Sequence, residues 1–151
     1  MKDLEEILKM KSTLALHKKT VLNIAYTYSV QKDEISSMLK EHDLSIEQFN
    51  VLRILRGQKG NPANLQDVQS RMVNKMSNTT RLIDKLLKKD LVKRSVCLEN
   101  RRKVEIFITE DGLNLLKVVD PKIEDAEENL VSNLTQEELT ELNMLLTKLR
   151  N

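Results

Sequence analysis

The stretch SNTTRLIDKLLKKDLVKR at residues 77–94 decides the predicted fold. On a helix of about 100° per residue, its apolar side chains share one face, and its Ser, Arg and Lys side chains occupy the other. We predict a helix over about residues 75–89, then a strand pair in residues 92–109, where β-branched residues alternate with polar ones. The core face of this helix is predicted to hold Met76, Thr79, Leu82, Ile83, Leu86 and Leu87.

The segment before this helix carries the start signals of two more helices. Ser45 and Gln48 form a capping box ahead of an apolar helix face. Asn64 is an N-cap for a short helix, in which Leu65 is predicted to point inward. A short helix, a turn, a second helix and a basic hairpin together predict a winged helix-turn-helix over residues 44–109.

Long amphipathic helices are predicted at both ends of the chain. In residues 4–25 the apolar side chains recur every three or four positions, as on one face of a helix. After the hairpin we predict a helix that either kinks at Pro121 or restarts there with Asp120 as its cap. The last helix begins with a capping box of Thr135 and Glu138 and carries a stripe of Leu. The predicted fold class is therefore mainly α with a small β-hairpin (α+β).

The composition fits one soluble, cytoplasmic domain and argues against several classes of function. The chain has 151 residues, of which 40% are hydrophobic, enough for a core. Only 3% are aromatic and three are glycine, too few for a base-stacking platform or a Gly-rich nucleotide loop. One cysteine excludes an intrachain disulfide, and no apolar run approaches the roughly 18 residues of a membrane span. No nucleophile–base pair or metal set emerges, so we expect neither an enzyme nor a cofactor.

The charge is unevenly distributed along the chain. Residues 71–103 carry eleven Lys and Arg against three Asp and Glu, whereas residues 104–151 carry four and eleven. A basic block of this density in a protein of net charge +2 indicates nucleic-acid binding. The alternative is a solvated helix face in a Lys-rich protein, and charge alone leaves both interpretations open.

We expect the first turns of the helix predicted over residues 75–89 to contact DNA bases, because the N-terminal residues of recognition helices contact base edges in the major groove. Arg, Asn, Ser and Thr bind base edges, and Lys further along the helix can meet phosphates. Arg at a hairpin tip can reach the neighbouring minor groove. The alternatives are a surface helix with an Arg81–Asp84–Lys85 charge ladder and a tip kept polar for solubility. The candidate DNA-binding residues are Lys75, Ser77, Asn78, Thr80, Arg81, Lys85, Arg101, Arg102 and Lys103.

Five stretches, in this order, resemble the multiple-antibiotic-resistance regulator (MarR) family of bacterial transcription factors. They are LSIEQFNVLRIL (44–55), NLQDVQSRM (64–72), SNTTRLIDKLLKKDLVKR (77–94), NRRKVEIFIT (100–109) and EDGLNLL (110–116). Two positions depart from the family pattern. Asp90 replaces the Gly that ends the recognition helix, and Asp tolerates left-handed geometry better than most residues. Asn100 replaces the wing Asp that orients an Arg, and Asn would hold Arg102 less strongly.

The resemblance implies a homodimer of winged-helix protomers that binds a pseudo-palindromic operator in duplex DNA. It implies one domain over residues 1–151, with a helical dimerisation region in 1–43 and 110–151 and a DNA-binding region in 44–109. The implied activity is transcriptional regulation, usually repression, with release of DNA when a small aromatic or phenolic effector binds between the regions. The alternative is a winged-helix protein-interaction module that meets an acidic partner and has no sequence preference on DNA.

Few residues are candidates for sensing an effector. Cys97 lies in the wing, whereas hydroperoxide-sensing members of the family place their reactive cysteine in the N-terminal helix region, so we favour an inert residue. His17 and His42 have no cluster of ligating neighbours, so no metal site is predicted. Tyr26 and Tyr28 are two positions apart on a predicted helix and face different sides, so only one can line a pocket.

Overall fold

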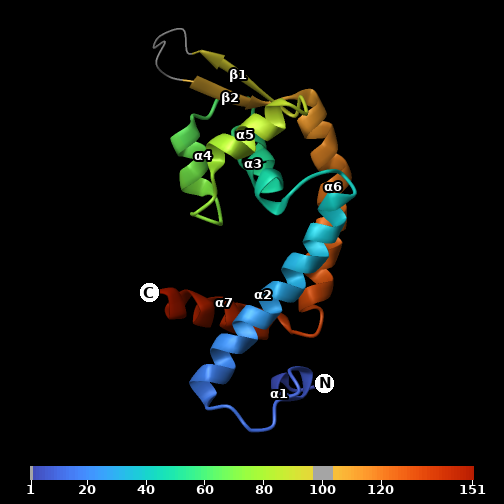
Figure 1. The fold of residues 1–151 in the computed structure, drawn as a ribbon, viewed down its shortest axis with the longest axis vertical. Coiled ribbons are helices and arrows are strands. Elements are labelled where there is room, and N and C mark those ends of the chain that lie inside the picture. The colour runs from blue at the N-terminus through green and yellow to red at the C-terminus, as the bar shows by residue number, and fades with distance from the viewer. Residues whose placement is uncertain (1, 97–103) are drawn as a thin grey trace.

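The computed structural model describes residues 2–96 and 104–151 of the chain. These residues are mostly helical and include a two-stranded antiparallel hairpin, which confirms the predicted fold class (Figure 1). In chain order the elements are α1 (Leu4–Ile7), α2 (Leu16–Lys40), α3 (Ile46–Arg56), α4 (Leu65–Arg71), α5 (Thr79–Leu87), β1 (Val92–Val96), β2 (Val104–Ile108), α6 (Glu110–Val131) and α7 (Gln136–Arg150).

Reciprocal capping boxes fix where three of the helices begin. The Ser45 hydroxyl accepts a hydrogen bond from the Gln48 N–H at 3.2 Å, and the Gln48 side chain accepts one from the Ser45 N–H at 3.0 Å. Asn64 and Thr135 begin α4 and α7 with the same reciprocal arrangement. Each capping box satisfies N–H groups that have no partner within the helix, which is why these local sequence patterns located the three starts correctly.

The N-terminal segment differs from the prediction, because it forms two helices rather than one. α1 has only four residues, and Lys9 after it adopts a left-handed φ of 51°. Most side chains between α1 and α2 are exposed, so no packing holds that stretch helical. The Lys19 ammonium on α2 lies 2.7 Å from the Asp3 carboxylate and 2.8 Å from the Glu5 carboxylate. These ion pairs tie α1 back to α2.

The hydrophobic core lies among α3, α4, α5 and the hairpin, and the end of α2 and the first half of α6 close it on one side. Each of these elements contributes side chains that are at most 1% exposed. Full burial of a Leu, Ile or Val side chain is worth about 1.5–3 kcal/mol, so this cluster is the main source of stability in the described fold. Its members include Leu39, Val51, Leu52, Val68, Ile83, Leu86, Ile106, Leu116 and Val119.

The hairpin is anchored to the entry of α4. β1 and β2 pair antiparallel, with Val92 opposite Ile108. Ala63 then adds a short bridge beside β2. Its N–H donates to the Ile106 carbonyl at 3.0 Å, and its carbonyl accepts from the Ile106 N–H at 2.9 Å. Two backbone hydrogen bonds therefore fix the position of α4 relative to the hairpin.

α6 is a continuous helix from the hairpin to the terminal region, so of the two predicted alternatives at Pro121 the restart is wrong. Asp120 is not a cap, and its carboxylate instead pairs with Arg56 on α3. Pro121 removes one helical hydrogen bond, and buried side chains on both sides of it hold α6 in place. At the start of α6, Gly112 lies so close to the hairpin that an added Cβ would sit 2.4 Å from the Leu91 carbonyl oxygen.

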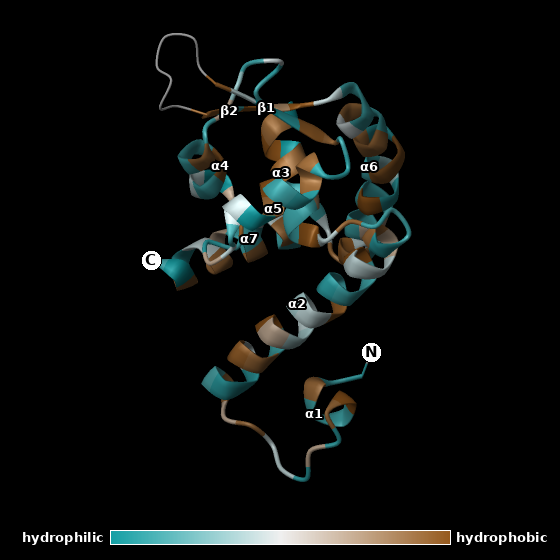
Figure 2. Ribbon diagram, turned by 45° about the horizontal axis from the view of Figure 1, so that its top comes forward, coloured by the Kyte–Doolittle hydropathy of each residue, from teal (hydrophilic) through white to brown (hydrophobic). Residues whose placement is uncertain are grey.

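The outer half of α2 and the whole of α7 are the least covered parts of the molecule. α2 lies beside α6, and α7 extends away from both (Figure 1). Figure 2 shows hydrophobic residues recurring along both α2 and α7. No helix in the described ranges is long and apolar enough to cross a membrane. The exposed apolar side chains include Leu16, Val21, Tyr28, Met144, Leu145 and Leu149.

Candidate nucleic-acid interface

α5 is shorter than the helix predicted over residues 75–89. Its N-cap is Asn78, whose side-chain oxygen accepts a hydrogen bond from the Arg81 N–H at 3.1 Å. Lys75 and Ser77 therefore lie in the turn before the helix. Met76 was predicted on the core face, but it is 92% exposed, because the helix that would turn it inward has not yet begun. After α5, Asp90 has a left-handed φ of 55°, as its position predicted.

α5 has one buried face and one exposed face. Apart from Met76, the predicted core residues are buried or half-buried beneath it. A helix that is anchored by one face and presents hydroxyl, guanidinium and ammonium groups on the other has the shape and the donors that a major groove accepts. The buried residues are Thr79, Ile83 and Leu86, and the exposed residues are Thr80, Arg81, Asp84, Lys85 and Lys88.

Side chains of α4 hold the turn that precedes α5. The Gln69 amide donates a hydrogen bond to the Lys75 carbonyl at 2.8 Å, and the Thr79 hydroxyl donates to the Gln69 side-chain oxygen. The Lys75 ammonium donates to the Ser70 carbonyl at 2.5 Å. The ammonium group of Lys75 is therefore engaged within the turn, where it helps to set the start of α5.

Asp84 ties α5 to the hairpin rather than to its own helix. A guanidinium nitrogen of Arg94 on β1 lies 3.1 Å from the Asp84 carboxylate. Asp84 therefore does not form the charge ladder with Arg81 and Lys85 that was the alternative interpretation. Both partners are partly exposed, so the pair adds little stability, but it orients the hairpin against α5.

A groove of about 480 Å³ opens between α4, α5 and the hairpin, next to the exposed face of α5. Thr80 and Arg94 line it, so a helix and a strand both supply donors. Leu65, predicted to point inward, lines this groove instead and is 40% exposed. No local sequence pattern predicts Arg94 at this site, because its position depends on the ion pair between β1 and α5.

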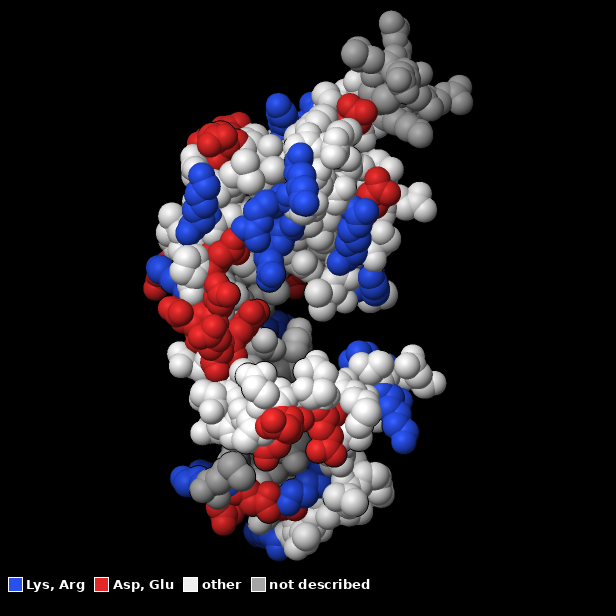
Figure 3. All heavy atoms as spheres, turned by 180° about the vertical axis from the view of Figure 1, so that it is seen from behind, with Lys and Arg blue, Asp and Glu red and all other residues white. Residues whose placement is uncertain are grey.

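The predicted wing-tip residues Arg101, Arg102 and Lys103 lie outside the described residues, as do Cys97 and Asn100. Among the described residues, basic side chains still gather on the winged half of the molecule. Figure 3 shows several Lys and Arg side chains grouped there, and a group of Asp and Glu on the side where α6 lies. The described surface therefore shows the same separation as the sequence, with basic residues on the winged half and acidic residues near α6.

Known proteins share both this sequence pattern and this geometry. The MarR family model matches residues 44–104. The transcriptional regulator PecS of Dickeya dadantii is 31% identical over 116 residues, which span 74% of this chain and 68% of PecS. A MarR transcription factor from Planctomyces limnophilus is 31% identical and has a TM-score of 0.69, covering 90% of this chain and 98% of that one. The chain belongs to the MarR family.

The MarR-family fold extends over most of the chain. The Bordetella bronchiseptica protein BpsR, whose DNA binding is regulated by 6-hydroxynicotinic acid, shares the fold with a TM-score of 0.79 at 22% identity. That match covers 93% of this chain and 99% of BpsR. The relatives that decide the family are transcription regulators and not enzymes. The protein is accordingly a DNA-binding transcriptional regulator of the MarR family.

A second cavity of this MarR-family protein, of about 220 Å³, lies among α2, α3 and α6. Phe49 lines it, and the Arg53 guanidinium lies 5.5 Å from the centroid of the Phe49 ring. Tyr28 also lines it, whereas Tyr26 does not, in agreement with the prediction that only one of the two could. The cavity thus combines apolar walls, an aromatic ring and a cation at the junction of the winged half and the terminal helices.

The two histidines of this MarR-family protein lie far apart in the sequence and in different settings. His17 is exposed on α2, and His42 is half-buried in the turn between α2 and α3. Within residues 2–96 and 104–151, no group of three His, Cys, Asp or Glu side chains is placed to hold a metal ion.

Proposed function

We propose that this protein binds a pseudo-palindromic operator as a homodimer and represses the genes beside it. The main support for the proposal is that α5 exposes one polar face while its opposite face is buried in the core. Residues in the first turns of α5 are proposed to contact base edges, and lysines in its second half are proposed to contact phosphates. The wing is proposed to contact the minor groove. The turn before α5 is proposed to position the helix. The proposed DNA-binding set is Lys75, Ser77, Asn78, Thr80, Arg81, Lys85, Arg101, Arg102 and Lys103.

A second copy of the chain is the proposed cover for the terminal helices. α7 has no buried residue, and Leu145 and Leu149 on it are 50% and 61% exposed. Val21 on α2 is 62% exposed. Uncovered apolar stripes on both terminal segments fit an interface in which a two-fold axis brings the same surfaces together. We assign residues 1–43 and 110–151 to dimerisation and residues 44–109 to DNA binding.

A small aromatic or phenolic effector is proposed to occupy the cavity among α2, α3 and α6. Phe49 supplies a ring for stacking, and Arg53 supplies a cation for a phenolate or carboxylate. The cavity touches α3 of the winged half and α2 and α6 of the terminal half, so an occupant would bias the angle between them. Regulation of BpsR by 6-hydroxynicotinic acid supports an effector of this chemistry.

Selection of binding sites from a random duplex library, read by sequencing near physiological salt, tests the proposal. Enrichment of an inverted repeat is expected, and sedimentation of the resulting complex should give two protein chains per duplex. Weak, salt-sensitive binding without an enriched sequence would contradict the proposal. It would favour the alternative of a winged-helix module that meets an acidic protein partner.

A further inference from the structure

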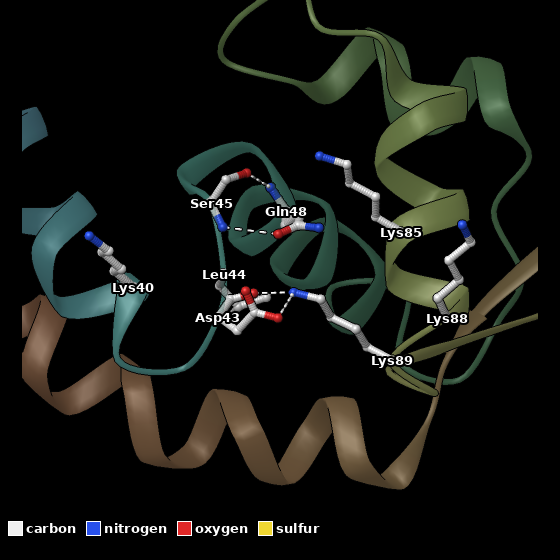
Figure 4. A pocket seen from close by; sticks show the side chains of 8 residues that line it. All are labelled: Lys40, Asp43, Leu44, Ser45, Gln48, Lys85, Lys88 and Lys89. Atoms are coloured by element: carbon white, nitrogen blue, oxygen red, sulfur yellow. Dashed lines mark hydrogen bonds and ion pairs between the residues drawn. The ribbon is translucent and has the colours of Figure 1, made fainter.

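A basic pocket of about 490 Å³ lies where the end of α2 and the start of α3 approach α5 (Figure 4). Lys40 lines it from the end of α2, and three lysines line it from the end of α5 and the turn that follows. The acidic residue in its lining is Asp43. The lysines of the pocket are Lys40, Lys85, Lys88 and Lys89.

Gln48 presents an unpaired amide group to this pocket. The residue is only 5% exposed, and its side-chain oxygen is occupied by the hydrogen bond from the Ser45 N–H. Its amide nitrogen donates to no atom within residues 2–96 and 104–151, and Figure 4 shows it pointing toward the side of Lys85. This donor is open to the pocket, so it is available to an acceptor that enters there.

Asp43 fills part of the pocket as an internal anion. Its carboxylate lies 2.8 Å from the Lys89 ammonium, which also donates a hydrogen bond to the Asp43 carbonyl. The hydrogen bond from Lys89, together with the positive charges of Lys89 and Lys85, holds the pKa of the Asp43 carboxyl below its usual range. Lys40, Lys85 and Lys88 form no ion pair within the described part of the chain. Because Asp43 is the one carboxylate among the described residues that line the pocket, beside four lysines, the pocket keeps an excess of positive charge.

We propose that this pocket binds a phosphate-type oxyanion, which accepts hydrogen bonds from the Gln48 amide, Lys85 and Lys89. The start of α3 adds the positive end of a helix dipole, and charge-assisted hydrogen bonds favour an anion over a neutral ligand. Figure 4 shows Lys85 and Lys89 extending toward the start of α3, with Lys40 and Lys88 at the rim. The oxyanion has two possible sources, a free phosphorylated small molecule or a backbone phosphate of bound DNA. Only the second source rests on the proposed function.

Titration of the whole protein with pyrophosphate, at constant ionic strength set with chloride, tests for the free anion. Calorimetry measures the affinity, and the side-chain amide NMR signals of Gln48 report whether the anion reaches the pocket. We expect saturable binding together with a shift of the Gln48 amide signals. Shifts confined to other surface groups would argue against a free anion at this site.

Two variants should move the affinity in opposite directions. Gln48→Glu keeps the acceptor for the Ser45 N–H but replaces the donor with a carboxylate, so pyrophosphate binding should weaken by at least about tenfold. Asp43→Asn removes the internal anion and frees Lys89, so binding should tighten several-fold, and Asn is compatible with the φ of 52° at this position.

Matched controls separate a built site from a general effect of net charge. Gln136→Glu at the start of α7 and Asp125→Asn on α6 change the net charge as the two pocket variants do. Both should leave the pyrophosphate affinity within about twofold, because exposed charges beyond a Debye length are screened. Equal responses in the pocket variants and their controls would overturn the proposal of a free-anion site.

Binding to duplex DNA at several salt concentrations tests whether the oxyanion is a backbone phosphate of DNA. Lys89→Gln removes a proposed ligand of the oxyanion that lies after the end of α5, and Lys117→Gln on α6 is its control. If the pocket holds a backbone phosphate, Lys89→Gln lowers the slope of log affinity against log salt by about 0.9, and the control does not. That result without pyrophosphate binding assigns the site to DNA. Absence of both effects overturns the proposal, whereas failure of sequence selection alone bears on the proposed function.

Discussion

The winged half and the terminal helices have the same amphipathic periodicity but differ in what covers their apolar faces. Ile83 and Leu86 on α5 are fully buried by their own chain. Val21 on α2 and Leu149 on α7 are 62% and 61% exposed. Periodicity therefore predicts that a face must be covered, and it does not say by which surface. In the winged half the cover is internal, and in the terminal half we assign it to a second chain.

The largest effect should come from truncating a buried residue of the winged half. Leu86→Ala should lower the free energy of unfolding by about 2–5 kcal/mol, because it leaves a cavity in the core. Leu145→Ala on α7 is the matched truncation in the terminal half, and its cost should depend on protein concentration, because it weakens association. Urea unfolding of both variants at several protein concentrations measures this. If the loss of stability in Leu145→Ala did not depend on protein concentration, the proposal that a second chain covers α7 would be contradicted.

The junction of the two halves should be nearly as sensitive. In Gly112→Ala the new Cβ would meet the Leu91 carbonyl at 2.4 Å and the Ile108 side chain at 2.7 Å. We expect a loss of about 1–3 kcal/mol in the free energy of unfolding, because the start of α6 must move away from the hairpin. Gly57→Ala is the control, because its nearest new contact is 3.3 Å and its φ is −61°. Equal costs for both variants, measured by thermal unfolding, would show that the close approach is unimportant.

A change on the exposed face of α5 should affect DNA binding while leaving both halves folded. Arg81→Ala should cost about 1–3 kcal/mol of operator affinity, because a base-edge contact is lost. Fluorescence anisotropy on the selected operator measures the affinity, and circular dichroism checks the fold. Unchanged affinity would contradict the assignment of α5.

Lys88→Gln is the informative companion to this variant. It should weaken binding to all duplexes alike and flatten the salt dependence, as expected for a phosphate contact. A loss confined to the selected operator would instead place Lys88 among the residues that distinguish sequences.

The smallest predicted effect is confined to the N-terminus and depends on pH. The hydrogen bonds from Lys19 lower the pKa of the Asp3 and Glu5 carboxyls below their ordinary values of 3.8 and 4.5. A carboxyl whose pKa is lowered by folding adds stability above its ordinary pKa and loses it as the pH falls through the lowered value. The attachment of α1 to α2 should therefore begin to weaken below the ordinary pKa of Glu5 and be lost as the pH falls through the lowered values of both carboxyls.

Amide exchange at Leu14 measures this detachment, because its N–H donates to the Glu5 carboxylate. Because intrinsic amide exchange varies with pH, the readout is the protection factor of Leu14, and Lys19→Gln should reduce its dependence on pH. An equal pH dependence in this variant would show that the ion pairs do not hold α1.

The sequence predicted those features that short-range patterns encode. Capping residues such as Ser45 and Asn64 act within one helical turn, so they located helix starts, and alternating β-branched residues located the hairpin. Met76 was misplaced because the start of α5 is set by Gln69, which hydrogen bonds to the turn from α4. Arg94 was not found because its partner lies on another element.

The break after α1 was also missed. Apolar spacing continues through that stretch, but most of its side chains are exposed among the described residues. The same limit applies to the basic pocket, whose residues come from α2, α3 and α5 and converge only in the folded chain.

The placement of α2 beside α6 has a consequence for synthesis on the ribosome. Residues 41–109 are added between the two helices, which takes roughly 3–14 s at about 5–20 residues per second. Through that interval α2 has been synthesised, but the helix that lies against it has not been made. α2 therefore waits for its partner in the nascent chain, and the order of the elements sets when these two helices can pack together.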